Sequence, residues 1–288
     1  MNRKKKKSKE SLFNITVRRL LKNKLAVLGL VIIVIMVLLA IFALLLSPYK
    51  YDAADIRNAF AKPSWEHPCG TDDLGRDILS RLMYGGRYSL RIGLISISVA
   101  LLGGMTIGSI AGYFGGWFDI IIMRVLDIFQ AIPGLIMSIA VCAVLGPGFS
   151  NCILALAIGL IPGFARMTRA SVLNVRKMEY LEAATSINAS NFRIISRHVL
   201  PNAIAPLIVS ATMGIASAIL VAASLSFIGL GVQPPTPEWG AMLSAGRSYI
   251  RNYPHLVIFP GITIMLAVLS LNLLGDGLRD ALDPKLKD

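Results

Sequence analysis

Long apolar segments alternate with short polar segments along the chain, which is the pattern of a protein that crosses a membrane several times. The first apolar segment, residues 25–46, contains no charged residue, and a helix of that length spans about 30 Å of hydrocarbon. Five further segments follow, at roughly residues 92–113, 125–145, 152–165, 203–229 and 256–274. The pattern predicts an all-α integral membrane protein with six transmembrane helices. The fourth segment is short and contains Pro162, so we expect its flanks to extend it or the helix to tilt.

The composition agrees with a membrane location, because 55% of the residues are hydrophobic and 16% are charged. An average soluble domain is about 45–50% apolar and about 25% charged. A disordered chain lacks the apolar groups as well, so both a soluble enzyme and a disordered protein are excluded. The three cysteines, Cys69, Cys142 and Cys152, form no C-x-x-C pair. Neither a disulfide framework nor a zinc site is therefore indicated.

The net charge of +13 is concentrated at the N-terminus, where ten of the 29 Lys and Arg residues precede Leu25. This tail has no aromatic residue beyond Phe13 on which bases could stack, so we expect anionic membrane lipid as its partner and no nucleic acid. The positive-inside rule places both termini in the cytoplasm. The chain then divides into a basic cytoplasmic tail (1–24), a first transmembrane helix (25–46), an extracytoplasmic loop (47–88) and a core transmembrane domain (89–288) with a cytoplasmic loop (171–201).

Two predicted spans carry a small residue at every fourth position, which lets helix backbones approach closely. The stripes consist of Ala100, Gly104, Gly108, Gly112 and Gly116 in the second span and of Ser210, Gly214, Ala218 and Ala222 in the fifth. Two interpretations stay open. The stripes are packing faces, or they line a translocation pathway that widens and narrows as the helices slide.

Charged residues are scarce inside the predicted spans. Arg124 and Asp127, near the start of the third span, are spaced to pair on one helical turn. Ion-driven carriers and voltage sensors keep functional charges within the membrane, so the scarcity indicates a transporter that is energised from elsewhere.

Residues 171–201 contain the pattern of two short helices around a turn. The first helix has an apolar face made of Val175, Met178, Leu181 and Ala184. Asn188 tolerates a left-handed backbone, and Ser190 is placed to cap a second helix that runs to Arg197. Pro201 marks the start of the fifth span. Two short helices held between two membrane helices predict a docking element.

A known sequence motif coincides with this element, and it consists of Glu182-Ala183-Ala184, the turn residue Asn188 and Leu200-Pro201. The set resembles the E-A-A loop of the permease subunits of bacterial ABC importers, whose pattern is E-A-A-x3-G-x9-I-x-L-P. Asn188 stands at the glycine position and His198 at the isoleucine position, and Asn can adopt the positive φ of glycine. The resemblance implies a coupling helix, with Glu182, Ala183 and Ala184 in contact with the ATP-hydrolysing subunit.

Four further segments extend the resemblance over residues 25–285. They are the run 67–77 with Ser80-Arg81 and Tyr84-Gly85, the segment 112–116, the segment 229–240, and the segment 275–280 with Asp283-Pro284. In this order, on six spans, they are similar to the second permease subunit of the dipeptide and oligopeptide branch, the C-type permease. The resemblance implies the type I ABC importer permease fold.

The resemblance also implies the partners and the mechanism. These are a homologous second permease, two ATP-binding subunits that use ATP and magnesium, and an extracytoplasmic substrate-binding protein. The expected function is translocation of dipeptides or oligopeptides by alternating access, with no cofactor on this chain. Related permeases serve glutathione and nickel chelates, which are the alternative cargo. A stand-alone channel or secondary carrier is the alternative from a different class.

Two polar segments outside the spans allow other interpretations. Asp72, Asp73, Arg76 and Asp77 could form a metal or acid–base site with His67, but no further acid completes a ligand set, so we expect a charge-paired loop. Residues 233–239 contain three prolines, which predicts a rigid outer loop with Trp239 at the membrane interface. The chain contains no phosphate-binding loop, no H-E-x-x-H and no nucleophile elbow, so we expect neither ATPase nor hydrolase activity.

Overall fold

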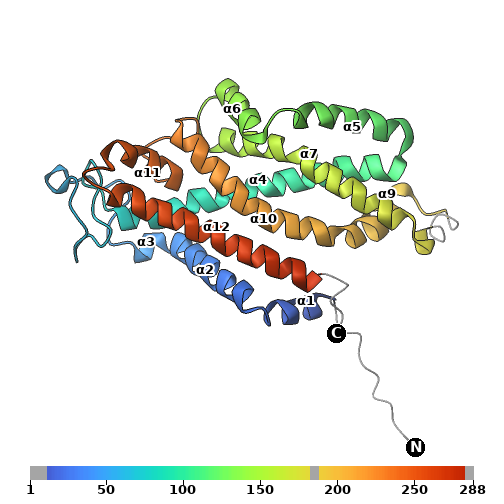
Figure 1. The fold of residues 1–288 in the computed structure, drawn as a ribbon, viewed down its shortest axis with the longest axis horizontal. Coiled ribbons are helices and arrows are strands. Elements are labelled where there is room, and N and C mark those ends of the chain that lie inside the picture. The colour runs from blue at the N-terminus through green and yellow to red at the C-terminus, as the bar shows by residue number, and fades with distance from the viewer. Residues whose placement is uncertain (1–11, 182–187, 283–288) are drawn as a thin grey trace, which may run out of the picture.

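The structure is a computed structural model that describes residues 12–181 and 188–282, and its regular elements in these ranges are helical. Figure 1 shows an elongated bundle whose long helices run roughly along one axis. The helices are α1 (Leu12–Leu20), α2 (Lys24–Ile41), α3 (Ala43–Leu46), α4 (Ile78–Phe114), α5 (Gly116–Gln130), α6 (Gly134–Leu145), α7 (Phe149–Arg176), α9 (Asn191–Ile194), α10 (Leu200–Phe227), α11 (Trp239–Gly246) and α12 (His255–Leu282). Short 3-10 turns occur at Ile56–Asn58 and Arg247–Tyr249.

Five helical segments among the described residues are long and apolar enough to cross a membrane, and a bent pair gives up to six. The five are α2, α4, α7, the continuous run Asn191–Phe227 and α12. The bent pair is α5 with α6, which meet at 84°. The predicted third span, 125–145, was expected as one helix but crosses this break. Pro133 lies at the N-cap of α6, and proline excludes its preceding residue from regular helix.

Other boundaries also differ from the sequence prediction. The second span was expected over 92–113, but α4 already begins at Ile78, where the Asp77 carboxylate accepts a hydrogen bond from the Ser80 N–H at 2.7 Å. The first turns of α4 thus fall in the segment 47–88 that was expected as the extracytoplasmic loop. The expected single helix over 25–46 is divided at Phe42 into α2 and α3. The fourth span is longer than its apolar core, since α7 continues through Pro162 to Arg176.

The glycine stripe of α4 packs against α7. A Cβ atom on Gly104 would lie 2.4 Å from the Cβ of Phe164, and one on Gly108 would lie 2.2 Å from the Ala165 carbonyl oxygen. Neither position therefore accepts a side chain without moving α7. The packing interpretation of this stripe is confirmed at these positions, whereas Gly116 has no atom within 4 Å of its built Cβ.

The two ends of the bundle carry different structures. We call residues 47–77 together with residues 232–254, which include α11, the capped end. Residues 176–181 and 188–203, with the adjoining end of α4, are the far end. The two lie at opposite ends of the long axis in Figure 1, and α1 and the last turn of α12 lie toward the far end. Trp239 was expected at the membrane interface, but it is 2% exposed and its indole N–H donates to the Leu82 carbonyl at 2.9 Å.

Candidate functional site

The predicted ATPase-contact residues Glu182, Ala183 and Ala184 lie outside the described residues. The structure describes both ends of their loop. Leu181 and Ile194, one on each side, are buried in the same apolar cluster, whose other members are Val172, Val175, Val199 and Ala203. The Tyr113 hydroxyl lies 2.9 Å from the Asn191 side-chain oxygen and joins the end of α4 to α9. The described residues on both sides of the loop therefore share one packed apolar cluster, which we call the basal cluster.

The turn after the loop matches the sequence prediction. Asn188 has a φ of 56°, which is the left-handed conformation. The Ser190 hydroxyl accepts a hydrogen bond from the Arg193 N–H at 3.4 Å and caps α9. The expected separate second helix is wrong, because α9 passes through a π-helical turn, Ile195–Val199, directly into α10. Leu200 and Pro201 are the first two residues of α10. The wide turn moves the preceding carbonyls away from the Pro201 ring, which would clash with them in regular helix.

Apolar side chains that the sequence did not predict to be exposed lie on both sides of the loop in the sequence. Phe192 is 82% exposed and Met178 is 52% exposed, and Tyr180 is also exposed. Met178 was expected on the buried face with Val175 and Leu181, but α7 ends at Arg176 and the following turn directs it outward. An exposed apolar group of this kind at a bundle end marks a contact surface.

Ion pairs tie α5 to α7. Arg124 lies 4.0 Å from Asp127, which confirms the predicted pair, but Asp127 lies closer to Arg166, at 2.8 Å. The Arg169 guanidinium donates to both carboxylate oxygens of Asp119. Because each carboxylate on α5 pairs with an arginine on α7, the bent pair is attached to the bundle by charge as well as by packing.

A cavity of about 610 Å³ opens between α7, α10 and α12. Ser210 lines it, together with Met167, Ala205, Pro206, Val209, Met213, Arg279 and Leu282. The other predicted pathway residues lie further along α10, where Ala218 and Ala222 are buried and a Cβ on Gly214 would lie 2.8 Å from Ile97. Within this chain the stripe on α10 therefore has an open part at Ser210 and a packed part beyond it.

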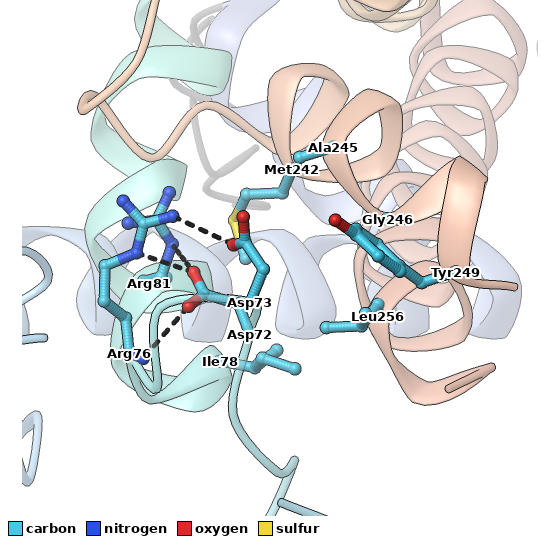
Figure 2. Close-up of a pocket in the computed structure, with 10 residues that line it drawn as sticks. All are labelled: Asp72, Asp73, Arg76, Ile78, Arg81, Met242, Ala245, Gly246, Tyr249 and Leu256. Atoms are coloured by element: carbon cyan, nitrogen blue, oxygen red, sulfur yellow. Dashed lines mark hydrogen bonds and ion pairs between the residues drawn. The ribbon is translucent and has the colours of Figure 1, made fainter. Parts of the chain in front are cut away.

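The acidic segment at the capped end forms a network of ion pairs. Asp72 lies 2.7 Å from the Arg76 Nε and 3.5 Å from the Arg81 Nε, and Asp73 lies 3.5 Å from Arg76. Figure 2 shows both carboxylates turned toward the two guanidinium groups, with Tyr249 across a pocket of about 30 Å³. A space of that size holds about one water molecule.

Asp77 pairs with a histidine and caps a helix in the same segment. Its carboxylate lies 3.0 Å from the His67 Nδ1 and also caps α4. Over residues 12–181 and 188–282, no group of three or more His, Cys, Asp or Glu side chains is placed to hold a metal ion. The interpretation as a charge-paired loop is confirmed for the described residues.

Comparison with known proteins identifies the family. Residues 104–288 match the family described as "Binding-protein-dependent transport system inner membrane component", and residues 11–63 match "N-terminal TM domain of oligopeptide transport permease C". The chain belongs to this family of transport permeases. The dipeptide transport system permease protein DppC of Alkalihalophilus pseudofirmus is 50% identical over 270 residues, which cover 94% of this chain and 89% of the relative.

Two further relatives have the same extent of similarity. The glutathione transport system permease protein GsiD of Pectobacterium atrosepticum is 46% identical and covers 94% of this chain and 90% of its own length. The di/tripeptide transport system permease protein DppC of Pseudomonas aeruginosa is 46% identical over 92% of this chain and 90% of the relative. The resemblance to C-type permeases is therefore confirmed, and the permease is a transport subunit rather than an ATPase.

Solved structures confirm the fold. The inward-facing MetNI methionine ABC transporter contains a chain that aligns with a TM-score of 0.58 and 19% identity, covering 71% of this permease and 97% of that chain. The permease thus has the fold of type I ABC importer permeases and is a multi-pass membrane protein.

Proposed function

We propose that this permease is the C-type subunit of an ATP-driven importer that moves dipeptides or oligopeptides across the bacterial cytoplasmic membrane. Two of the relatives are named for dipeptide or di/tripeptide transport and one for glutathione. These cargoes share peptide bonds and free carboxylates. Glutathione and nickel chelates are the alternative cargo of the same transporter class.

The proposed complex contains a homologous second permease, two ATP-binding subunits and an extracytoplasmic substrate-binding protein. ATP and magnesium are used by the ATP-binding subunits, and this chain carries no cofactor. Both termini and the loop at the far end lie in the cytoplasm. This orientation is supported by the basic residues before Leu25 and by the positions of α1 and the end of α12 toward the far end (Figure 1).

The observation that carries the proposal is the basal cluster, whose members flank the loop in the sequence. It unites the ends of α7 and α10 through Leu181, Ile194 and Val199. A push on the loop by a closing pair of ATP-binding subunits is transmitted to both helices together, because a packed apolar cluster moves as a unit. One of these helices, α10, carries Ser210 to the 610 Å³ cavity. We infer that this motion opens and closes the cavity during alternating access.

The test is a tagged purification of the permease from its native membrane, with companions identified by mass and ATP hydrolysis assayed with dipeptide and binding protein. We expect a second permease, ATP-binding subunits and peptide-stimulated hydrolysis. Glu182→Lys should abolish peptide uptake, whereas Glu66→Lys, an exposed residue of the capped end, should leave uptake unchanged. Normal uptake in the Glu182→Lys variant would contradict the coupling role.

The stand-alone carrier is tested with the same preparation. The permease alone, reconstituted in liposomes, should give no peptide uptake without the ATP-binding subunits and ATP. Uptake by the single chain would replace the importer proposal with a secondary carrier.

A further inference from the structure

Two arginines lie on one face of the membrane-spanning helix α4 where it passes the end of α2. Arg87 and Arg91 are one helical turn apart and therefore project on the same side. They line a groove of about 240 Å³ together with Val37, Ala40, Ile41, Gly86, Leu90 and Leu94. The groove is apolar apart from these two cations.

The two arginines differ in their partners. The Arg87 guanidinium donates to the Ala40 carbonyl at 2.7 Å and to the Ile41 carbonyl at 2.8 Å, where α2 ends, and lies over the Tyr84 ring. Arg91 is exposed and has no hydrogen bond or ion pair with any described residue. Arg87 therefore holds α2 against α4, and Arg91 is free to bind an anion.

The unpaired charge of Arg91 is unusual because this residue lies at the depth of the membrane hydrocarbon. Arg91 shares the groove with Val37, and the chain beyond Val37 is apolar as far as Leu46, with Leu38, Ile41, Phe42 and Leu44 to Leu46 exposed. At 1.5 Å per residue, that surface extends about 13 Å past the level of Val37. A cation at hydrocarbon depth is costly unless it is paired or its side chain extends to the interface.

The surroundings favour a lipid as the source of the anion. α2 is at the edge of the bundle in Figure 1, and its side chains Val34, Leu38 and Ile41 are exposed. Leu94 on the opposite wall is exposed too, so the groove is continuous with the surface that faces hydrocarbon. An acyl chain matches these walls, and a phosphate matches the cations through charge-assisted hydrogen bonds.

We propose that the groove between α2 and α4 is a binding site for one anionic glycerophospholipid in the leaflet at the capped end. The phosphate binds Arg91, with Arg87 adding positive charge, and an acyl chain lies along Val37, Leu90 and Leu94. The site stabilises the contact of α2, the peripheral helix, with the rest of the bundle. The proposal does not depend on the cargo.

The experiment measures lipid retained by the intact complex after extensive detergent washing, using native mass spectrometry with added phosphatidylglycerol. Arg91→Gln should reduce the population with bound phosphatidylglycerol about tenfold, the effect of losing a hydrogen bond to a charged group. Arg91→Lys should keep most of it. The matched control is Arg251→Gln, an exposed arginine of the capped end, which should behave as the unchanged protein.

A second variant separates a lipid from a free anion. Val37→Trp fills the groove and keeps both cations, so it should also reduce lipid binding, while millimolar inorganic phosphate should displace no lipid from the unchanged protein. Equal lipid retention by Arg91→Gln and Arg251→Gln would overturn the proposal. So would displacement by dipeptide, which would make the site part of the transport pathway, or displacement by phosphate, which would make it an ion site only.

Discussion

The capped end and the far end differ in how they accommodate charged and apolar side chains. The charged residues that are buried in the described chain, Asp77, Arg81 and Glu238, all lie at the capped end or beside it. Each has hydrogen-bond or ion-pair partners within the chain. The described part of the far end has no buried charged residue and exposes Phe192 and Met178, whereas the capped end exposes Trp65 and Ile56 beside its paired charges.

The capped end therefore holds its buried charges by contacts within the chain, whereas the far end relies on apolar packing and exposes the apolar side chains that flank the loop in sequence. Removing one partner of a buried charge is strongly destabilising, and the partners of these charges belong to the same chain. Exposed apolar side chains on a packed base are typical of an interface. Variants of the buried charges at the capped end should therefore change the stability of the permease, and variants of the exposed apolar residues at the far end should change its association.

The largest effect on stability is expected for Glu238→Gln at the capped end. The Glu238 carboxylate is 1% exposed and accepts hydrogen bonds from the Ser89 hydroxyl and from the Gly240 and Ala241 N–H groups. In the variant, the NH2 group of glutamine replaces one of the acceptor oxygens and faces one of these hydrogen-bond donors. The mismatch should lower the free energy of unfolding by about 2 kcal/mol. A fluorescence melting curve of the purified complex measures the loss. Glu66→Gln, which is exposed, should melt as the unchanged protein, and equal melting of both variants would refute this account of the capped end.

The next effect concerns association at the far end. Phe192→Ser removes the most exposed large side chain beside the loop and should weaken binding of the ATP-binding subunits about tenfold, as expected for an aromatic interface residue. The melting temperature of the permease itself should not change, because Phe192 packs little within the chain. Affinity is measured by titrating ATP-binding subunits onto immobilised permease.

The matched control is Trp65→Ser at the capped end, where Trp65 is fully exposed. It removes an aromatic side chain of similar exposure on the proposed opposite side of the membrane. An equal loss of affinity in both variants would show that Phe192 has no specific role in the interface.

The sequence predicted the parts of the structure that depend on local patterns. Apolar length predicted the spans, and Asn188 and Ser190 were correctly assigned to the turn and the cap, because both roles follow from the residue and its nearest neighbours. The break at Pro133 and the burial of Trp239 were missed. A hydropathy average does not reveal the break at Pro133, because both halves of the broken span are apolar. The sequence of the proline-rich segment before Trp239 is the same whether that segment covers the bundle or projects from it.

The functional surfaces were predicted only in part, because they depend on where helices end and on contacts between residues far apart in the sequence. The periodicity that placed Met178 on a buried face assumed an uninterrupted helix, whereas α7 ends at Arg176. The pairing of Arg166 with Asp127 joins residues 39 positions apart, and no local signal identifies such a partner. The stripe on α10 could not be divided into the open position Ser210 and the buried positions Ala218 and Ala222, because that division depends on where α4 and α7 lie.

A smaller effect is expected at the turn of the far end. Asn188→Val places a β-branched residue at a φ of 56°, which costs about 1 kcal/mol, whereas Asn188→Gly relieves the conformation. Amide hydrogen exchange of Arg193 and Ile194, whose N–H groups bond to Ser190, should accelerate about fivefold in the valine variant and remain unchanged in the glycine variant. Equal exchange in both variants would show that the turn does not need the left-handed backbone.

The last prediction concerns chemical reactivity rather than stability or association, and its subject is Cys69 at the capped end. Burial, aided by the nearby charge of Asp77, raises the pKa of the Cys69 thiol to about 11. The reactive thiolate is then scarce near neutral pH, and its fraction increases about tenfold for each pH unit until the pH approaches that pKa. A maleimide should therefore label Cys69 slowly at pH 7.5 and markedly faster at pH 9.

The comparison for this measurement is a cysteine placed at Ala53, an exposed position of the same loop, in a Cys69→Ser background. It should react about a hundredfold faster at pH 7.5, since its pKa lies near the usual value. Equal labelling rates for the two cysteines would mean that the capped end opens faster than maleimide reacts. The hydrogen bonds of the capped end would then not keep it closed. Slow labelling of Cys69 alone supports a capped end that stays closed without partner subunits.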